Sequence, residues 1–190
     1  MFELRYKTSP IWTQTVLADF DAFLIDHAAA EKKASGMANS MVSHYPDKPD
    51  IVTAMIDLSI EEMAHFREVV KILMKRGLQL GPDTRDPYVN ALRQHSRKGT
   101  DVYLLDRLLL GSVIEARGCE RFGLVADALP TGELKEFYIA ITESESRHED
   151  LFEKLAHNYF PTKVVNHRLN ELLELEAAIV ESLPIIAALH

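Results

Sequence analysis

Six residues whose side chains can bind metal ions recur along the chain at matched spacings. They form two Glu-x-x-His pairs, each preceded by a lone glutamate: Glu31, Glu62, His65, Glu115, Glu145 and His148. Each pair follows its lone glutamate by about thirty residues, and the second set repeats the first after 83 or 84 residues. A four-helix bundle holds two metal ions in this way, with a glutamate from each helix and a histidine one turn after two of them. The spacing therefore predicts a two-metal carboxylate site.

Each candidate ligand lies within an apolar stripe at helical spacing. The stripe around Glu62 and His65 is spaced alternately by four and three residues and contains Ile51, Met55, Leu58, Val69 and Ile72. Comparable stripes run from Leu134 to Leu155 around Glu145 and His148, from Leu105 to Leu129 around Glu115, and through Leu17, Leu24 and Ala38 around Glu31. Residues three or four apart share a helix face, so all six candidates should face a core. Unpaired carboxylates in a core are costly, and bound cations remove that cost.

The alternative is that these residues are structural. A single Glu-x-x-His is a weak signal, because helices are rich in glutamate and a histidine on an apolar face is usually a hydrogen-bonded core residue. The side chains could also lie at the stripe edges and reach solvent. Two matched pairs together with two lone glutamates favour the metal site.

Six helical stretches would position these residues. They cover residues of about 11–43, 47–76, 89–97, 101–128, 131–159 and 163–182. The segment HYPDKP ends the first stretch, Asp47 or Asp50 caps the second, and Gly77 stops it. The long Gly- and Pro-punctuated connection GLQLGPDTRDPYV suits a bundle with one crossover. We therefore expect a single all-α domain over residues 1–190, a four-helix bundle with a short connector helix and a C-terminal helix.

Composition agrees with a globular protein of one domain. The chain has 190 residues, of which 47% are hydrophobic and 26% charged. We find no apolar run long enough to span a bilayer and no signal-peptide core in MFELRYKTSPIW, which favours a cytoplasmic protein with no membrane partner. The single cysteine, Cys119, excludes an internal disulfide and any Cys-x-x-Cys site.

The ligand framework resembles that of the ferritin-like di-iron carboxylate superfamily. Within it, the stretches EEMAHFREV, IEARGCERF and ESESRHEDLF resemble the MiaE-type tRNA hydroxylases. These enzymes oxidise the isopentenyl-type side chain of a hypermodified adenosine beside the anticodon. The resemblance implies an O2-dependent monooxygenase with two iron ions, or manganese as the alternative, and O2 as co-substrate. It also implies tRNA and a ferredoxin or reductase-type electron donor as partners, with no role for DNA.

The same resemblance assigns roles to the six candidates. Glu31, Glu62, His65, Glu115, Glu145 and His148 would be both the metal ligands and the catalytic centre. Glu62 and Glu145 would bridge the ions, and Glu31 and Glu115 would be mainly terminal ligands. Cys119 lies one turn after Glu115 and either lines the oxygen pocket or is a buried structural cysteine.

Other activities of the superfamily remain open alternatives. A radical-generating reductase subunit would resemble a chain with tyrosine four residues after Glu31, where this chain has Ser35. Rubrerythrin-like peroxidases usually add a glutamate where this chain has Gly118. Manganese catalase is the strongest rival, and a metal-storage ferritin-like bundle is a rival from another class.

The charge distribution bears on tRNA binding. The chain carries a formal net charge of −8, whereas proteins that bind phosphates usually show a basic surface. Between Lys71 and Lys98, however, seven basic residues accompany only two acidic ones. A local basic patch beside an acidic body can still dock a phosphate backbone. The candidate RNA contacts are Arg85, Arg93, Arg97 and Lys98, although the same segment could be a solvated connector.

Overall fold

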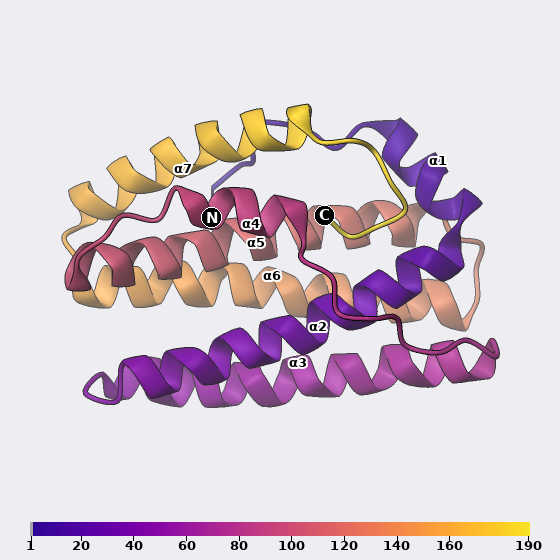
Figure 1. Cartoon of the computed structure of the whole chain (residues 1–190), viewed down its shortest axis with the longest axis horizontal. Helices are drawn as coiled ribbons and strands as arrows, with labels where there is room; N and C mark the ends of the chain where they lie inside the picture. The colour runs from indigo at the N-terminus through magenta and orange to yellow at the C-terminus, as the bar shows by residue number, and fades with distance from the viewer. Residues whose placement is uncertain (1) are drawn as a thin grey trace. The chain divides into compact units, whose positions relative to one another are not determined.

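The computed structural model describes residues 2–190, except for the side chain of Glu149. All regular secondary structure in these residues is helical (Figure 1). The helices are α1 (Pro10–Ala18), α2 (Phe20–His44), α3 (Pro49–Lys75), α4 (Pro87–Gln94), α5 (Thr100–Ala128), α6 (Glu133–Tyr159) and α7 (Thr162–Ser182). The predicted all-α class is therefore confirmed. Among the described helices, none is both long and apolar enough to cross a membrane.

The chain divides into two compact units. One contains Gln14–Thr84 and Ile186–Leu189, and so includes α2 and α3. The other contains the segment up to Thr13, Arg85–Ile185 and His190, and so includes α4 to α7.

In the α2–α3 unit, the two helices form an antiparallel pair (Figure 1). The hydroxyl of Ser35 donates to the carbonyl of Ser59 at 2.9 Å, and the hydroxyl of Ser59 donates back to the carbonyl of Ser35 at 3.2 Å. The main-chain amide of Leu189 donates to Asp26 at 2.8 Å, which fixes residues 186–189 against α2. The reciprocal bonds between Ser35 and Ser59 set the register of α2 against α3, and therefore the positions of Glu31 and Glu62 along the helix pair.

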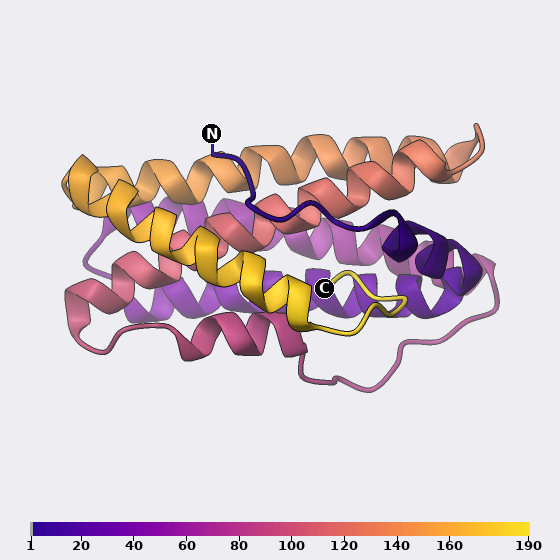
Figure 2. The ribbon, with the colours of Figure 1, turned by 90° about the horizontal axis from the view of Figure 1, so that it is seen from above.

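In the other unit, α5 and α6 form a second antiparallel pair. Helix α7 crosses α5 obliquely, and α4 contacts both α5 and α7 (Figure 2). The face of α6 that contains Glu145 is apolar on either side of it, with Tyr138 and Phe152 fully buried. Leu108 and Phe122 supply the matching buried face of α5. Helix packing thus places the predicted ligands of this pair in a dry interior.

The first predicted helix is broken into two. Asp19 leaves the helical backbone conformation, with φ −135° and ψ 64°, and its carboxylate accepts a hydrogen bond from the amide of Ala22 at 3.2 Å. This is an N-cap, so α2 starts at Phe20 and the seven-residue register does not continue back into α1. Leu17, which we expected on the Glu31 stripe, is consequently 41% exposed.

The predicted cap of α3 is also wrong. Neither Asp47 nor Asp50 is the N-cap, because that position belongs to Lys48, which makes no side-chain capping bond. Pro49 occupies the first turn, where its fixed φ suits a helix start and no amide is needed. Asp47 instead forms an ion pair with Lys48 at 2.8 Å.

Candidate metal centre

Helices α2 and α3 bring together the first three candidate ligands, Glu31, Glu62 and His65, which we call the first half-site. Glu31 and Glu62 are buried, with 4% and 1% of their surface exposed. Nδ1 of His65 lies 3.6 Å from one oxygen of Glu31 and 3.6 Å from one oxygen of Glu62. One ligand atom from each residue lies within 4.8 Å of the others. A metal ion could contact all three at that separation.

Helices α5 and α6 bring together the other three candidates, Glu115, Glu145 and His148, which we call the second half-site. All three are buried. Nδ1 of His148 lies 3.2 Å from Oε2 of Glu145, and one ligand atom from each residue again lies within 4.8 Å of the others. The Glu-x-x-His spacing therefore places carboxylate and imidazole on one helix face in both units, as the helical period requires.

The donor set of each half-site fits a metal ion. Each contains two carboxylates and one imidazole, with no lysine or arginine among its members. A divalent cation bound among these side chains would offset the repulsion between the two carboxylates. Hard oxygen donors with a single imidazole suit iron or manganese.

His27 belongs to this region although sequence reasoning did not include it. It is fully buried in α2, one turn before Glu31, and its Nε2 lies 2.6 Å from Oε1 of Glu31. When Glu31 is ionised, the imidazole is the donor, because an ionised carboxylate only accepts hydrogen bonds. The available signal was its position four residues before a predicted ligand, on the same face.

Arg117, which lies in the stretch IEARGCERF, is the centre of a second buried polar group, which we call the Arg117 cluster. Its members are Thr8, Tyr88, Arg117, Glu120 and Glu176. Arg117 is fully buried and donates to both oxygens of Glu176, from Nε at 2.7 Å and from NH2 at 3.0 Å. It also contacts Glu120 and donates to Thr8 at 3.1 Å. Tyr88 donates its hydroxyl to Glu176 at 3.1 Å.

The pKa values in the Arg117 cluster follow from burial and pairing. Burial acts to lower the pKa of Arg117, but the hydrogen bonds and charge of Glu176 outweigh it and the pKa is raised. Burial, followed by the charge of Glu176, raises the pKa of Tyr88 well above its ordinary value. Arg121 lies beside the cluster, and burial together with repulsion from Arg117 lowers its pKa to about 10. The carboxylates of this cluster therefore have their counter-charge within the chain.

Cys119 is half-buried on α5. Its thiol contacts the main-chain oxygen of Thr142 in α6 at 3.5 Å, within the sulfur hydrogen-bond range. This contact joins the two helices and is a packing role.

The candidate RNA contacts fall into two groups. Arg85, Arg93 and Lys98 are exposed. Arg97 instead donates to the buried carboxylate of Asp106, from NH2 at 2.6 Å and from its own amide at 2.7 Å. Asp106 also accepts from Arg168 at 2.9 Å. The guanidinium of Arg97 is therefore engaged in holding the start of α5.

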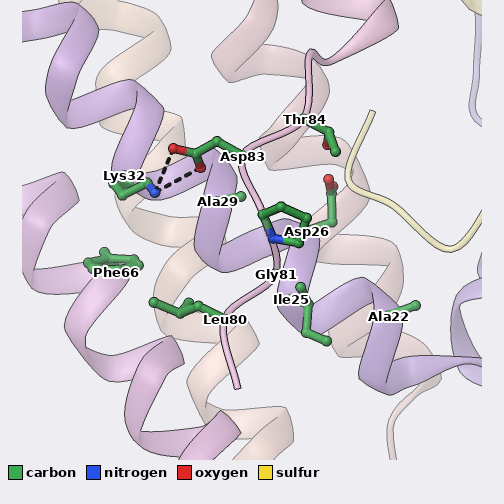
Figure 3. Close-up of a pocket in the computed structure, with 11 residues that line it drawn as sticks. Ala22, Ile25, Asp26, Ala29, Lys32, Phe66, Leu80, Gly81, Asp83 and Thr84 are labelled. Carbon is green, nitrogen blue, oxygen red and sulfur yellow. Dashed lines mark hydrogen bonds and ion pairs between the residues drawn. The ribbon is translucent and has the colours of Figure 1, made fainter. Parts of the chain in front are cut away.

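The connector between α3 and α4 is bound to α2 by polar contacts. Asp83 forms an ion pair with Lys32 at 2.8 Å (Figure 3). Lys33 donates to the carbonyl of Thr84 at 2.8 Å. A Cβ atom at Gly81 would lie 2.9 Å from the side chain of Ile25, so glycine permits this close approach.

The connector covers a cavity of about 390 Å³. Its lining consists of Ala22, Ile25, Asp26, Ala29, Lys32, Phe66, Leu80, Gly81, Pro82, Asp83 and Thr84. None of these residues belongs to the first half-site, so the cavity lies on a different face of α2.

Comparison with known proteins identifies the family. A model of the family described as tRNA-(MS[2]IO[6]A)-hydroxylase (MiaE) matches residues 2–190. A protein of Pseudomonas putida named tRNA 2-(methylsulfanyl)-N(6)-isopentenyladenosine(37) hydroxylase is 38% identical over 156 residues, covering 82% of this chain and 76% of that protein. A protein of Salmonella typhimurium with the same name is 29% identical over 157 residues, covering 83% of this chain and 57% of that protein.

A solved structure extends the comparison to the fold. The protein described as Protein 43 with aldehyde deformylating oxygenase activity from Synechococcus matches 100% of this chain and 96% of that chain, with a TM-score of 0.94 and 33% identity. The predicted ferritin-like fold is thereby confirmed. The family model spans nearly the whole sequence, and the Pseudomonas relative is 38% identical. This chain therefore belongs to the MiaE family of tRNA hydroxylases.

Proposed function

We propose that this chain is a non-haem di-iron monooxygenase that hydroxylates the isopentenyl side chain of a hypermodified tRNA adenosine. The observation that carries the proposal is the family match from residue 2 to residue 190 in a chain with two Glu–Glu–His half-sites whose carboxylates are buried. Buried carboxylates with one imidazole per group are the donors that O2-activating iron uses in helical bundles.

In this proposal, the two half-sites belong to one functional domain over residues 1–190 and hold one iron each. Glu31, Glu62 and His65 would bind one ion, and Glu115, Glu145 and His148 the other. The Synechococcus structure supports a single domain because it matches the whole of this chain. The bound iron would supply reduction of O2 and oxidation of an unactivated C–H bond.

The chain itself supplies ligand geometry and a dry interior. The face of α6 that holds Glu145 also contains the fully buried side chains of Tyr138 and Phe152. Phe122 on α5 is almost fully buried as well. Exclusion of water strengthens electrostatic interactions with the carboxylates and prevents side reactions.

The proposed reaction needs an external source of electrons. One oxygen atom of O2 enters the C–H bond and the other leaves as water, which consumes two electrons and two protons beyond the substrate. We propose a ferredoxin or reductase-type protein as the donor. A tRNA substrate would place the reaction in the cytoplasm.

The tRNA would present its modified adenosine as an unpaired anticodon-loop nucleotide. Splaying such a base out of its stack costs only a few kcal/mol, whereas a buried metal pair cannot reach a stacked one. We propose that Arg85, Arg93 and Lys98 contact the phosphate backbone, since their side chains are exposed. Arg97 is left out of this set because Asp106 binds its guanidinium.

The reaction is tested by nucleoside mass spectrometry. Reduced, iron-loaded protein is incubated with prenylated tRNA under isotopically labelled O2, with Glu145→Ala as the inactive control. We expect one labelled oxygen on the prenylated nucleoside with the wild type only. Unmodified nucleoside, combined with rapid hydrogen peroxide dismutation by a manganese-loaded sample, would replace the proposal with the catalase alternative.

The docking surface is tested separately. The triple variant Arg85→Ser, Arg93→Ser, Lys98→Ser should bind tRNA more weakly and with a shallower salt dependence, by roughly one unit of slope per lost phosphate contact. The matched control removes three other exposed basic residues, Arg5, Arg67 and Lys154. Equal effects of both triple variants would show that only net charge matters and that this surface is not the docking site.

A further inference from the structure

His27 and Glu31 form a buried pair on one face of α2. His27 has no exposed surface, and Glu31 is only 4% exposed. The Nε2–Oε1 distance of 2.6 Å is at the short end for a hydrogen bond to a charged acceptor. The ring of Phe23 packs beside the imidazole, with centroids 6.1 Å apart. In such surroundings a hydrogen bond is stronger than in water, and it holds the carboxylate in one orientation.

The two oxygens of Glu31 face different partners. Oε1 is bound to His27, and Oε2 lies 3.6 Å from Nδ1 of His65 within the first half-site. Oε2 is therefore the oxygen that lies toward His65, which would share an ion with Glu31. Outer hydrogen bonds of this kind fix the orientation of metal-binding carboxylates.

The second half-site cannot contain the same arrangement. The residue one turn before Glu115 is Gly111, at the position that corresponds to His27 after the shift of 84 residues. A Cβ atom at Gly111 would lie 2.9 Å from the ring of Phe152. The space that an imidazole would need is thus filled by an apolar ring from α6. The two half-sites share their ligand types. They differ in the residue one turn before the lone glutamate, which is His27 before Glu31 and Gly111 before Glu115.

We propose that His27 is a positioning residue that holds Glu31 by Oε1 and presents Oε2 to the metal. The lone glutamate of the first half-site is then held in one orientation before an ion binds. This inference rests on the proposed function, because it takes Glu31 to be a metal ligand.

The test compares His27→Phe, which removes the donor, with His27→Gln, which keeps an N–H near the position of Nε2. Iron binding to the otherwise intact protein is followed by calorimetric titration, and folding by circular dichroism. We expect His27→Phe to weaken one of two binding events by roughly 10–100-fold, with the other unchanged, and His27→Gln to recover most of that loss. The electronic absorption of the ferric protein should change in His27→Phe and return towards the wild type in His27→Gln.

His44 provides the matched control. It lies near the end of the same helix, is exposed, and contacts the carbonyl of Ser40. His44→Phe should leave both binding events unchanged. A folded His27→Phe protein with two unaltered affinities would overturn the inference, as would a His27→Gln protein that fails to recover binding.

Glu31→Ala separates this inference from the proposed function. Loss of one ion in Glu31→Ala with no effect of His27→Phe would reject the positioning role and keep the metal site. No effect of Glu31→Ala would reject Glu31 as a ligand, and with it part of the proposed function.

Discussion

Helix α5 contributes residues to two buried polar groups, which differ in the charges of their members. Glu115 belongs to the second half-site, whose members are two carboxylates and an imidazole. Two residues later, Arg117 holds Glu176 and contacts Glu120. In the Arg117 cluster the chain provides both signs of charge. The members of the half-site are instead two acids and a histidine, the donor types that bind a metal ion.

This difference separates a structural cluster from a binding site. A carboxylate paired with a buried guanidinium is fully committed to the fold, because removing either partner leaves a buried charge. The carboxylates of the second half-site lie within 4.8 Å of one another and of an imidazole, which suits them to share an ion. We therefore expect the Arg117 cluster to contribute stability and the half-site to bind metal, and each expectation can be tested.

The largest expected effect is at Arg117. Arg117→Met should lower the free energy of unfolding by about 3–5 kcal/mol, because Glu176 would remain buried without its partner. Denaturant titration of the metal-free protein measures this change. Arg67→Met is the control, since Arg67 is paired with Glu68 but its side chain is 69% exposed, and it should cost less than about 1 kcal/mol. Equal losses in both variants would remove the distinction between the clusters.

Metal removal should have the next largest effect. At a free ion concentration a hundred times the dissociation constant, binding stabilises the folded chain by about 2.7 kcal/mol. Chelation should therefore lower the melting temperature of the wild type. Glu145→Ala should respond less to chelation, whereas Arg117→Met should respond as strongly as the wild type. Full metal content in Glu145→Ala or His148→Ala would reject the half-site assignment.

A smaller effect tests the packing behind Glu115. Gly111→Ala places a methyl group 2.9 Å from the ring of Phe152 and should cost about 1–3 kcal/mol. Gly36→Ala is the control, because a Cβ atom there meets nothing within 4 Å and alanine favours a helix by up to about 1 kcal/mol. Thermal unfolding of both variants measures the contrast. Equal stabilisation by the two substitutions would show that Phe152 moves aside easily.

The smallest effect is confined to acid pH and concerns Asp106, a third buried carboxylate with its own cations. Burial acts to raise its pKa, but hydrogen bonds from Arg97 and Arg168 outweigh it, so the pKa is lowered. Ionised Asp106 therefore adds to the free energy of unfolding above the ordinary aspartate pKa, and this contribution is lost as pH falls through the lowered pKa. Asp106→Asn should flatten the fall of unfolding free energy below about pH 4. Glu136→Gln is the exposed control and should leave that slope almost unchanged. A slope that is the same in Asp106→Asn and in the wild type would contradict this assignment.

The sequence predicted the features that depend on local periodicity. The helices, the buried stripes and the grouping of carboxylate with imidazole at a spacing of three all follow from the helical repeat. The break at Asp19 was missed because an aspartate within a continuous apolar pattern can be either an exposed residue or an N-cap. Only the main-chain conformation decides which.

Long-range pairings were outside the reach of sequence reasoning. Arg97 was a candidate RNA contact because of its charge, and its pairing with buried Asp106 depends on how the turn before α5 folds back. Arg117 and Glu176 are 59 residues apart, and no periodicity connects them. His27 was readable in principle, although a histidine on an apolar face is ordinarily a core residue.

The Arg117 cluster also has a consequence for the order in which the protein can be completed during synthesis. Its guanidinium is bound by the carbonyl of Tyr6, the hydroxyl of Thr8 and the carboxylate of Glu176. These partners lie 111, 109 and 59 residues away along the chain. Residues 6 and 8 therefore wait for α5, and α5 waits for α7, before all these contacts of the guanidinium can form. The α2–α3 pair is made from a contiguous segment that leaves the ribosome earlier, so nascent chains should protect its amides first.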